Sequence, residues 1–323
     1  MTPTPQFIQI HQSQAEHIRE ELISGLRGSK AHASPKYLYN ELGSKLFEAI
    51  TCIPEYYPTR TEAEIFDQHA HDMAKQLPPA CALIDLGAGN CEKAVRLFPV
   101  FNPARYIAVD ISVDFLKVAL ERWQRQFPAL EMTGVGMDFS SELTLPVGLA
   151  LKPTQPRVLF YPGSSIGNFT PDEALVFLKQ VRSACSAVEG SGLLIGVDLV
   201  KSKAVLEAAY DDALGITAAF NRNMLLHFNA LAGTNFRLED WKHIGLYNTK
   251  LNRIEMHLEA LRDLTVTWEG GERPFAKGER IHTENSYKWT LKGFEELLKQ
   301  AGFSACKAYT DTEQKFAVFW AKA

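Results

Sequence analysis

Acidic residues recur at the ends of short apolar runs, and the first of them opens a glycine-rich turn. Asp85 precedes the segment LGAG at 86–89, Asp110 ends the next run, and Asp138 and Phe139 follow a weaker one. Glycines let the backbone approach a ligand, and an acid about 20 residues after such a turn can bond a ribose diol. An acid beside an aromatic ring can bond and cover an adenine. These residues therefore predict a site for a nucleoside-containing cofactor.

The third position of the glycine motif helps to distinguish nicotinamide dinucleotides from S-adenosylmethionine. That position is Glu92 instead of glycine. A carboxylate there would oppose a pyrophosphate at the helix N-terminus, whereas S-adenosylmethionine has no phosphate and carries a sulfonium cation. The alternative is that Asp85 and Asp110 merely cap helices. Two acids at successive strand ends beside a glycine turn favour the ligand crevice of an open sheet, with S-adenosylmethionine as the cofactor.

The elements that carry these residues alternate short apolar runs with helical patterns. We expect strands at 82–86, 106–110, 158–161 and 193–197, and a weaker one at 131–137. A helix capped by Ser112 and another that starts near Pro171 each show apolar residues at three-and-four spacing. This order is typical of an α/β fold built on a mainly parallel, Rossmann-like sheet.

Two regions, the first 60 or so residues and about 200–288, depart from this alternation and predict a second, inserted α+β lobe. Residues 204–231 read as helical, whereas 243–268 alternate as antiparallel strands do. A helix at 291–301, stopped by Gly302, and a strand at 316–320 then return to the first pattern. We therefore expect a methyl-donor-binding domain at 61–199 and 289–323, and a substrate-binding lobe at 1–60 and 200–288.

The composition is that of an ordinary globular protein. The chain has 323 residues, 46% of them hydrophobic and 22% charged, and a net charge of -4. Nothing in this balance suggests nucleic acid or an anionic membrane as a partner. No stretch approaches the roughly 20 apolar residues of a membrane span, and no signal peptide is evident. We expect a cytoplasmic protein.

The sequence offers no convincing metal site. The five cysteines are scattered, without the close pairs of a zinc site, and we interpret them as reduced and structural. His69 and His71 lie in a polar run with no second pair of ligands nearby, which favours a solvated helix face. No metal is expected.

Longer segments identify a family. The segments are YNELGSKLF at 39–47, PEYYPTR at 54–60, PGSSIGNF at 162–169 and AAFNRN at 218–223. Together they resemble the histidine Nα-methyltransferases of ergothioneine biosynthesis, over nearly the whole chain. Such long and unusual segments are far more specific than a short glycine motif. The same family includes fungal enzymes that N-methylate a prenylated tryptophan.

The resemblance implies trimethylation of L-histidine to hercynine by a two-lobed monomer, with the amino acid held between the lobes. The residues that it implicates fall into two groups. Cofactor contacts carry over to Gly87, Lys93, Asp110, Asp138 and Phe139. The amino and carboxylate groups would be held by Tyr56, Asn168 and Tyr210, the imidazole by Glu284 and Ser286 with Met256 beside it, and Gly163 and Tyr39 would complete the reacting pocket with Asn168.

The segment TENS at 283–286 also has a direct reading. On an extended segment Glu284 and Ser286 point to one face, where a carboxylate and a hydroxyl can bond the two imidazole nitrogens. Asn285, where a small apolar residue was expected, would then point to the opposite face. The alternatives are N-methylation of a tryptophan derivative, a nicotinamide-dependent oxidoreductase and a binding module without catalysis.

Overall fold

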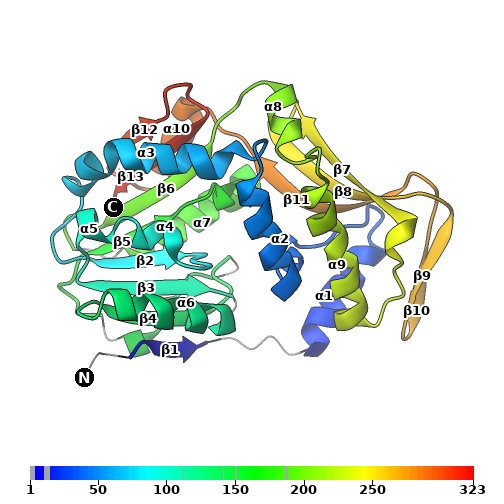
Figure 1. The fold of residues 1–323 in the computed structure, drawn as a ribbon, viewed down its shortest axis with the longest axis horizontal. Helices are drawn as coiled ribbons and strands as arrows, with labels where there is room; N and C mark the ends of the chain where they lie inside the picture. The colour runs from blue at the N-terminus through cyan, green and yellow to red at the C-terminus, as the bar shows by residue number, and fades with distance from the viewer. Residues whose placement is uncertain (1–3, 11–14, 112, 141, 150, 186–187) are drawn as a thin grey trace. The chain divides into compact units, whose positions relative to one another are not determined.

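The protein consists of two compact units. The computed structural model describes residues 4–10, 15–111, 113–140, 142–149, 151–185 and 188–323. Unit 1 comprises the described residues of Met1–Gln12, Arg60–Leu199 and Trp289–Ala323, and unit 2 comprises those of Ser13–Thr59 and Val200–Lys288. Both units are drawn in Figure 1 with the element labels that are used below.

Unit 1 is built on an eight-stranded sheet with the order β1-β4-β3-β2-β5-β6-β13-β12. The strands are β1 (Gln6–Gln9), β2 (Ala82–Leu86), β3 (Arg105–Asp110), β4 (Glu131–Gly136), β5 (Arg157–Tyr161), β6 (Gly192–Asp198), β12 (Ala305–Thr310) and β13 (Phe316–Lys322). Strands β1 to β6 run parallel to their neighbours, and β13 and β12 pair antiparallel at one edge. The predicted Rossmann-like sheet is therefore present, extended by an antiparallel edge.

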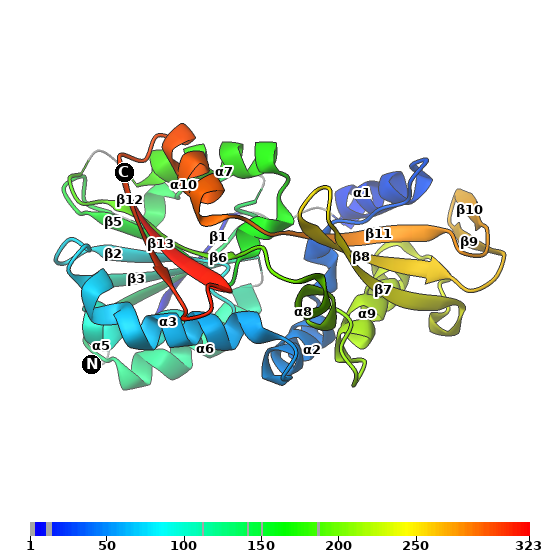
Figure 2. The ribbon, with the colours of Figure 1, turned by 90° about the horizontal axis from the view of Figure 1, so that it is seen from above.

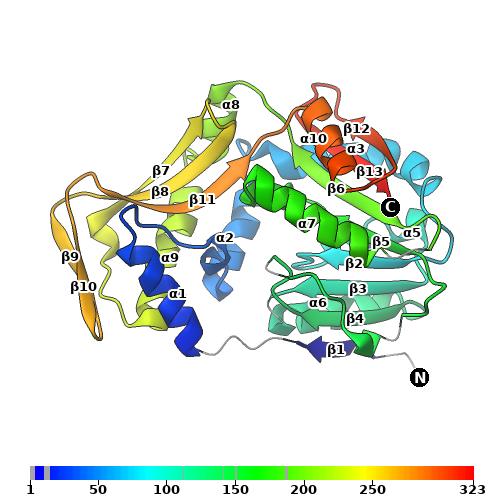
Figure 3. The ribbon, with the colours of Figure 1, turned by 180° about the vertical axis from the view of Figure 1, so that it is seen from behind.

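Helices cover both faces of this sheet. They are α3 (Tyr57–Ala74), α4 (Glu92–Val95), α5 (Phe98–Phe101), α6 (Val113–Gln126), α7 (Pro171–Ala184) and α10 (Leu291–Gln300), with short 3-10 turns η2 (Val147–Leu149) and η3 (Ser165–Asn168). Helices α3, α5 and α6 share one core with the sheet, and α7 and α10 share the other. Figures 2 and 3 show the sheet between these two layers.

The two cores follow from the strand period. In β2, Ile84 and Leu86 pack with α7 and α10, whereas Leu83 packs with α3, α5 and α6. A strand buried on both faces is apolar at almost every position, which is why these runs stand out in the sequence.

The start of α7 agrees with its sequence signal. Pro171 occupies the first turn, and Thr170 and Glu173 form a reciprocal capping box. The cap expected from Ser112 lies outside the described residues.

None of the helices within the described ranges has the length and apolar character needed to cross a membrane.

The N-terminal segment differs from expectation, because residues 1–60 were all assigned to the second lobe. Instead β1 pairs parallel with β4 and belongs to unit 1. A Cβ added at Gly134 would lie 2.8 Å from the Phe7 ring, so that glycine leaves room for the phenylalanine. A four-residue edge strand is too short to show a period, and tertiary pairing decides it.

Unit 2 combines helices with antiparallel strands. Its elements are α1 (Ala15–Arg27), η1 (Pro35–Leu38), α2 (Glu41–Cys52), α8 (Lys203–Ala208), α9 (Ile216–Ala232), η4 (Leu238–Asp240), β7 (Trp241–Asn248), β8 (Arg253–Ala260), β9 (Leu264–Trp268), β10 (Gly271–Phe275) and β11 (Arg280–Tyr287). Strand β8 lies between β11 and β7, and β9 and β10 form a separate hairpin. Helix α9 contacts α1, α2, β7 and β8 and so organises the core of the unit.

The helix predicted at 204–231 is interrupted. Helix α8 ends at Ala208, and α9 begins at Ile216 after Gly215, whose φ is +73°. The Asp212 carboxylate accepts hydrogen bonds from the backbone nitrogens of Ile216 and Thr217. A left-handed glycine and an acid that accepts from the first turn therefore define the start of α9.

Candidate active site

The glycine-rich turn after β2 brings several of the predicted cofactor residues together. Gly87 and Gly89 both have positive φ, +73° and +52°. The Gly89 nitrogen donates to Oδ2 of Asp110 at 2.9 Å. A Cβ at Gly87 would lie 3.6 Å from the Phe139 ring. The carboxyl ends of the neighbouring strands β2, β3 and β4 (Figure 1) thus precede a turn that lies beside an acid and an aromatic ring.

Asp138 lies two residues beyond the end of β4. Its Oδ1 accepts a hydrogen bond from the Ser140 nitrogen at 3.1 Å and another from the Ser140 hydroxyl. The neighbouring Phe139 ring meets the Tyr161 ring edge-on, at 5.9 Å between centroids. The acid and the ring are therefore held by separate local contacts.

Asp85, at the end of β2, is a buried acid. Its Oδ2 accepts a hydrogen bond from the Tyr106 hydroxyl at 2.7 Å, whereas Oδ1 has no partner within the described part of the chain. Burial raises the pKa of Asp85 to about 7, against the opposing effects of the Tyr106 hydrogen bond and the Lys93 charge. A buried carboxylate oxygen left without a partner is costly, and it is typical of a ligand site.

Lys93 is anchored by Glu62, a residue that the sequence analysis missed. Glu62 is 1% exposed, and its two oxygens accept from Lys93 Nζ at 2.6 Å and from the Gly163 nitrogen at 2.7 Å. Glu62 lies on the apolar face of α3 with Ile65 and Phe66. An acid inside an apolar helical stripe is the signal that could have found it.

The segment 162–168 is held rigidly at its start. Gly163 and Ser164 have φ of +77° and +58°, and a Cβ at Gly163 would lie 2.9 Å from Lys93 Nζ. The Asp198 nitrogen donates to the Ser164 hydroxyl at 2.8 Å. The turn η3 then ends at Asn168, whose side chain is partly exposed. The glycine is required by both its φ and the nearby lysine.

In unit 2, three predicted tyrosines are joined through aromatic edges. Tyr56 meets Tyr210 at 6.1 Å between ring centroids, and Phe47 meets both Tyr56, at 6.1 Å, and Tyr39, at 5.6 Å. Phe220 of α9 packs on Tyr39 at 5.4 Å. Edge-to-face contacts of this kind fix the orientation of the rings.

Tyr210 is also fixed through its backbone. His243 Nε2 lies 2.7 Å from the Tyr210 carbonyl oxygen, and Nδ1 lies 2.9 Å from the Asn221 amide nitrogen. Burial lowers the pKa of His243, so the imidazole is neutral, donating to the carbonyl and accepting from Asn221. Asn221, in the segment AAFNRN at 218–223, thus helps to fix the Tyr210 backbone through His243. No sequence motif marks this histidine.

A β-bulge aims Glu284 into the candidate site. The register of β11 against β8 pairs His282 with His257 and then Glu284 with Met256, so Thr283 is the extra residue. The Thr283 hydroxyl donates to the Met256 carbonyl at 3.0 Å. Without the bulge, Glu284 would share the face of His282. With it, Glu284 shares a face with Met256 and Ser286.

Ser286 belongs to a buried polar cluster with Tyr210 and Lys288. The Tyr210 hydroxyl donates to Ser286 Oγ at 2.8 Å, and Lys288 Nζ donates to Ser286 Oγ at 2.7 Å and to the Tyr210 hydroxyl at 3.2 Å. Burial raises the pKa of the partly buried Glu284 to about 7, although the charge of Lys288 acts in the opposite direction. Lys288 was not predicted, but it continues the alternation of Glu284 and Ser286.

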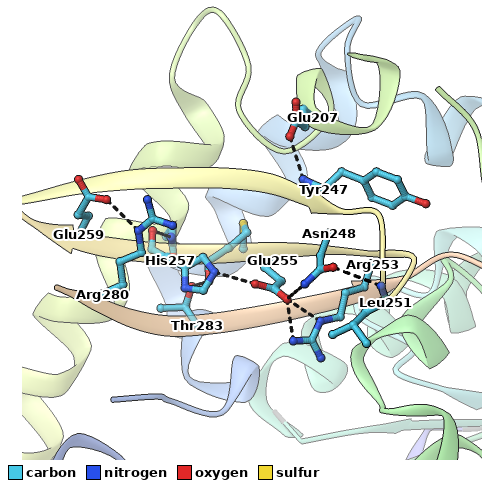
Figure 4. A network of polar contacts seen from close by, with 12 residues as sticks. Glu207, Tyr247, Asn248, Leu251, Arg253, Glu255, His257, Glu259, Arg280 and Thr283 are labelled. Carbon is cyan, nitrogen blue, oxygen red and sulfur yellow. Dashed lines mark hydrogen bonds and ion pairs between the residues drawn. The ribbon is translucent and has the colours of Figure 1, made fainter. Parts of the chain in front are cut away.

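The opposite face of the same sheet carries a separate polar network, shown in Figure 4. Glu255 accepts hydrogen bonds from Arg253, Asn248 and His257 at 2.8 to 3.1 Å. Asn285 pairs with Glu255 in the register and so lies on this face, as strand alternation predicts. This network ties the strands together on the far side from Glu284 and Ser286.

The predicted site residues thus form two sets, each within one unit. Unit 1 holds Gly87, Lys93, Asp110, Asp138, Phe139, Gly163 and Asn168, and unit 2 holds Tyr39, Tyr56, Tyr210, Met256, Glu284 and Ser286. Within the described residues, no group of three or more His, Cys, Asp or Glu side chains could hold a metal ion.

Comparison with known proteins identifies the family of this chain. The chain is 34% identical to the histidine N-alpha-methyltransferase of Mycolicibacterium smegmatis, with 95% of each protein covered. It is 31% identical to ergothioneine biosynthesis protein 1 of Neurospora crassa, over 84% of this chain and 31% of that protein. It is 24% identical to the 4-dimethylallyltryptophan N-methyltransferase of Claviceps purpurea, over 94% of both. A family model described as histidine-specific, S-adenosylmethionine-dependent methyltransferase matches residues 18–323. The chain therefore belongs to the family of S-adenosylmethionine-dependent, histidine-specific methyltransferases.

Proposed function

We propose that this chain transfers three methyl groups from S-adenosylmethionine to the α-amino nitrogen of L-histidine, forming hercynine for ergothioneine biosynthesis. The observation that carries the proposal is the pair Glu284 and Ser286 on one face of β11, beside Met256. A carboxylate and a hydroxyl can bond the two nitrogens of an imidazole. An indole has one N–H and no acceptor nitrogen, so it could donate to the carboxylate but would leave the serine hydroxyl without an acceptor, which disfavours that substrate.

The carboxyl edge of the unit 1 sheet fits the methyl donor by its chemistry. Asp110 would hold the ribose, and Asp138 and Phe139 would bind the adenine, beside the turn at Gly87. Lys93 offers a cation to the methionyl carboxylate, and the buried Asp85 offers a negative charge to the methionyl ammonium group. The bound cofactor supplies an electrophilic methyl group on a sulfonium centre.

The contribution of the protein is then positioning. We assign the amino and carboxylate groups to Tyr56, Asn168 and Tyr210, and further contacts with the reacting amine to Gly163 and Tyr39. The amine has to be unprotonated and about 3 Å from the methyl carbon at each transfer. Because an α-amino group titrates with a pKa of about 8, we expect turnover to rise with pH through this range. Anchoring the carboxylate and ring leaves the nitrogen free to rotate between transfers.

The direct test is mass spectrometry of single amino acids incubated with the purified protein and S-adenosylmethionine. Trimethylated histidine as the dominant product, with mono- and dimethylated forms appearing first, is the expected result. Methylation of a tryptophan derivative in preference to histidine would retain the reaction and overturn the roles of Glu284 and Ser286. Absence of methylation with every amine, although the cofactor binds, would favour a binding module without catalysis.

The remaining sequence-based expectations have different outcomes. Membership of the methyltransferase family replaces the alternative of a nicotinamide-dependent oxidoreductase. The assignment of cofactor binding to unit 1 and of the imidazole ring to unit 2 belongs to our proposal. The monomeric state and the cytoplasmic location stay predictions, which light scattering and cell fractionation can test.

A further inference from the structure

Lys288 is a buried cation beside the proposed imidazole-binding pair. Lys288 is only 3% exposed, and its Nζ lies 4.8 Å from the centroid of the Tyr210 ring. A lysine ammonium has three hydrogens and no lone pair, so it can only donate. Burying such a group is costly unless its hydrogens are used. Its contacts with Ser286 and Tyr210 therefore have a defined direction.

That direction passes through both hydroxyls. The Tyr210 hydroxyl and Ser286 Oγ each accept a hydrogen from Lys288 Nζ, at 3.2 and 2.7 Å. Between the two hydroxyls, 2.8 Å apart, the phenol is the more acidic and donates to the serine. Ser286 Oγ then accepts two hydrogens, which occupy both of its lone pairs. Its own hydrogen has to be donated elsewhere.

We propose that Lys288 is a positioning residue that fixes Ser286 as a hydrogen-bond donor and thereby makes the site select a neutral imidazole in one tautomer. The inference rests on the proposed function, because it takes the ring of histidine as the group that meets Glu284 and Ser286. An ionised Glu284 only accepts, and Ser286 held by Lys288 only donates. A ring that fits this pair has one N–H and one nitrogen lone pair.

The proposal excludes specific ligands. An imidazolium has two N–H groups, and the second would meet a serine oxygen whose lone pairs are already used. A neutral ring methylated on one nitrogen has no N–H, so it always lacks the hydrogen for Glu284, and it also lacks the lone pair for Ser286 when the methylated nitrogen faces the serine. A pyrazole side chain, which keeps one donor and one acceptor nitrogen, satisfies the hydrogen-bonding pattern. Selection by donor and acceptor pattern is strong, because a mismatch leaves buried polar groups unpaired.

The test is a double-mutant cycle of Lys288→Met and Ser286→Ala, with KM for histidine as the readout at saturating cofactor. Assays at pH 8.5 keep Glu284 ionised, because its pKa is about 7. If Lys288 acts through Ser286, Lys288→Met raises KM about ten-fold or more in the wild-type background and less than about three-fold in the Ser286→Ala background. Lys250→Met, at an exposed turn of the same unit, is the matched control and should leave KM unchanged.

A second variant keeps the proposal testable if Lys288→Met does not fold. Lys288→Gln retains an N–H donor without the charge, and KM should stay within about five-fold of wild type. A glutamine variant that binds histidine as weakly as Ser286→Ala would contradict the proposal, as would equal effects of Lys288→Met in both backgrounds. Failure of the wild type to methylate histidine would instead contradict the proposed function. If the wild type forms trimethylhistidine but Lys288→Met raises KM equally in both backgrounds, only the role of Lys288 is contradicted.

Discussion

Two carboxyl groups, one in each unit, have pKa values well above those of ordinary surface acids. Burial raises the pKa of both Asp85 and Glu284 to about 7. In the unfolded chain these groups would ionise at much lower pH. A buried carboxylate of this kind lowers stability at neutral pH, and it is typical of a site where its charge binds a ligand.

Glu284→Gln should therefore stabilise the ligand-free protein while weakening histidine binding. Between pH 4.5 and 7 the unfolded state loses the proton of Glu284 before the folded state does, so wild-type stability falls as pH rises through this window. Above pH 7 the glutamine variant should be about 1–3 kcal/mol more stable, measured by denaturant unfolding. KM for histidine should rise about ten-fold or more, because a charge-assisted hydrogen bond is lost.

Glu255→Gln is the matched control for that prediction. Although its burial acts in the opposite direction, hydrogen bonds from Arg253, Asn248 and His257 lower the pKa of Glu255 to about 2. Its ionised form therefore stabilises the protein above pH 4.5, and this contribution is lost as pH falls toward 2. The glutamine variant should be less stable at neutral pH. Destabilisation by both substitutions would contradict the assignment of Glu284 to a ligand.

Asp110 is expected to act on the cofactor alone. Asp110→Ala removes the acceptor of the Gly89 nitrogen and the proposed ribose contact, and should raise the Kd for S-adenosylmethionine about ten-fold or more. Isothermal titration with the cofactor measures this, and Asp110→Asn, which keeps an oxygen acceptor for Gly89, separates loop closure from ribose binding. An unchanged cofactor Kd in the alanine variant would refute the assignment.

At the scale of elements, Glu62 joins α3 to the segment 162–168. Glu62→Ala leaves the Gly163 nitrogen and Lys93 without their acceptor, and should cost about 2–4 kcal/mol in the free energy of unfolding. Glu62→Gln should cost less and still weaken cofactor binding, because the amide no longer attracts Lys93. Glu64→Ala, two residues along the same helix and exposed, should be near neutral. Similar losses at both positions would show that the effect does not come from the buried contacts of Glu62.

The polar face of the unit 2 sheet predicts a loss of stability in mild acid. Burial, and then the neighbouring His257, lower the pKa of His282 to about 4. The unfolded chain binds a proton at about pH 6.5 whereas the folded chain does not, so stability should fall by about 2–3 kcal/mol as pH drops from 6.5 to 4.5. His282→Gln should flatten this part of the profile, and substitution of the exposed His71 by Gln should leave it unchanged.

The elements also show where a strand pattern is a poor guide. The alternation of β8 is regular, and it places Met256 and His257 on opposite faces. Strand β11 contains a bulge at Thr283, which sequence does not reveal, because the extra residue is fixed by the hydrogen bond to the Met256 carbonyl. The pair at 284 and 286 was predicted correctly as sharing a face, since two-residue spacing survives beyond the bulge.

At the scale of the whole molecule, each unit has its own core and its own share of the predicted residues. Hydrogen exchange with mass spectrometry should therefore separate the ligands. S-Adenosylhomocysteine should protect backbone amides at 85–94 and 136–140 in unit 1, whereas histidine should protect 284–288 in unit 2. The hairpin at 264–275 is the internal reference. Protection of 85–94 by histidine, or of 284–288 by S-adenosylhomocysteine, would contradict the division of roles.

The sequence by itself determined the parallel sheet, the glycine turn and acids at its carboxyl edge, and the family. Strands buried on both faces are almost continuously apolar, so they stand out in the sequence. A turn that needs positive φ is usually built with glycine, so its position is also visible in the sequence. The family resemblance rests on the segments 39–47, 54–60, 162–169 and 218–223. It implicated residues, such as Tyr56 and Tyr210, that periodicity alone would have assigned to packing.

Only the tertiary structure decided which distant groups meet. Glu62 reaches Gly163 and Lys93, and His243 fixes the Tyr210 backbone, across long separations in sequence. It also placed β1 beside β4 and Lys288 beneath the hydroxyls of Tyr210 and Ser286. Burial gives these polar residues their effect, since a hydrogen bond or charge in a desolvated place is worth far more than one in water, and burial is a property of the folded chain.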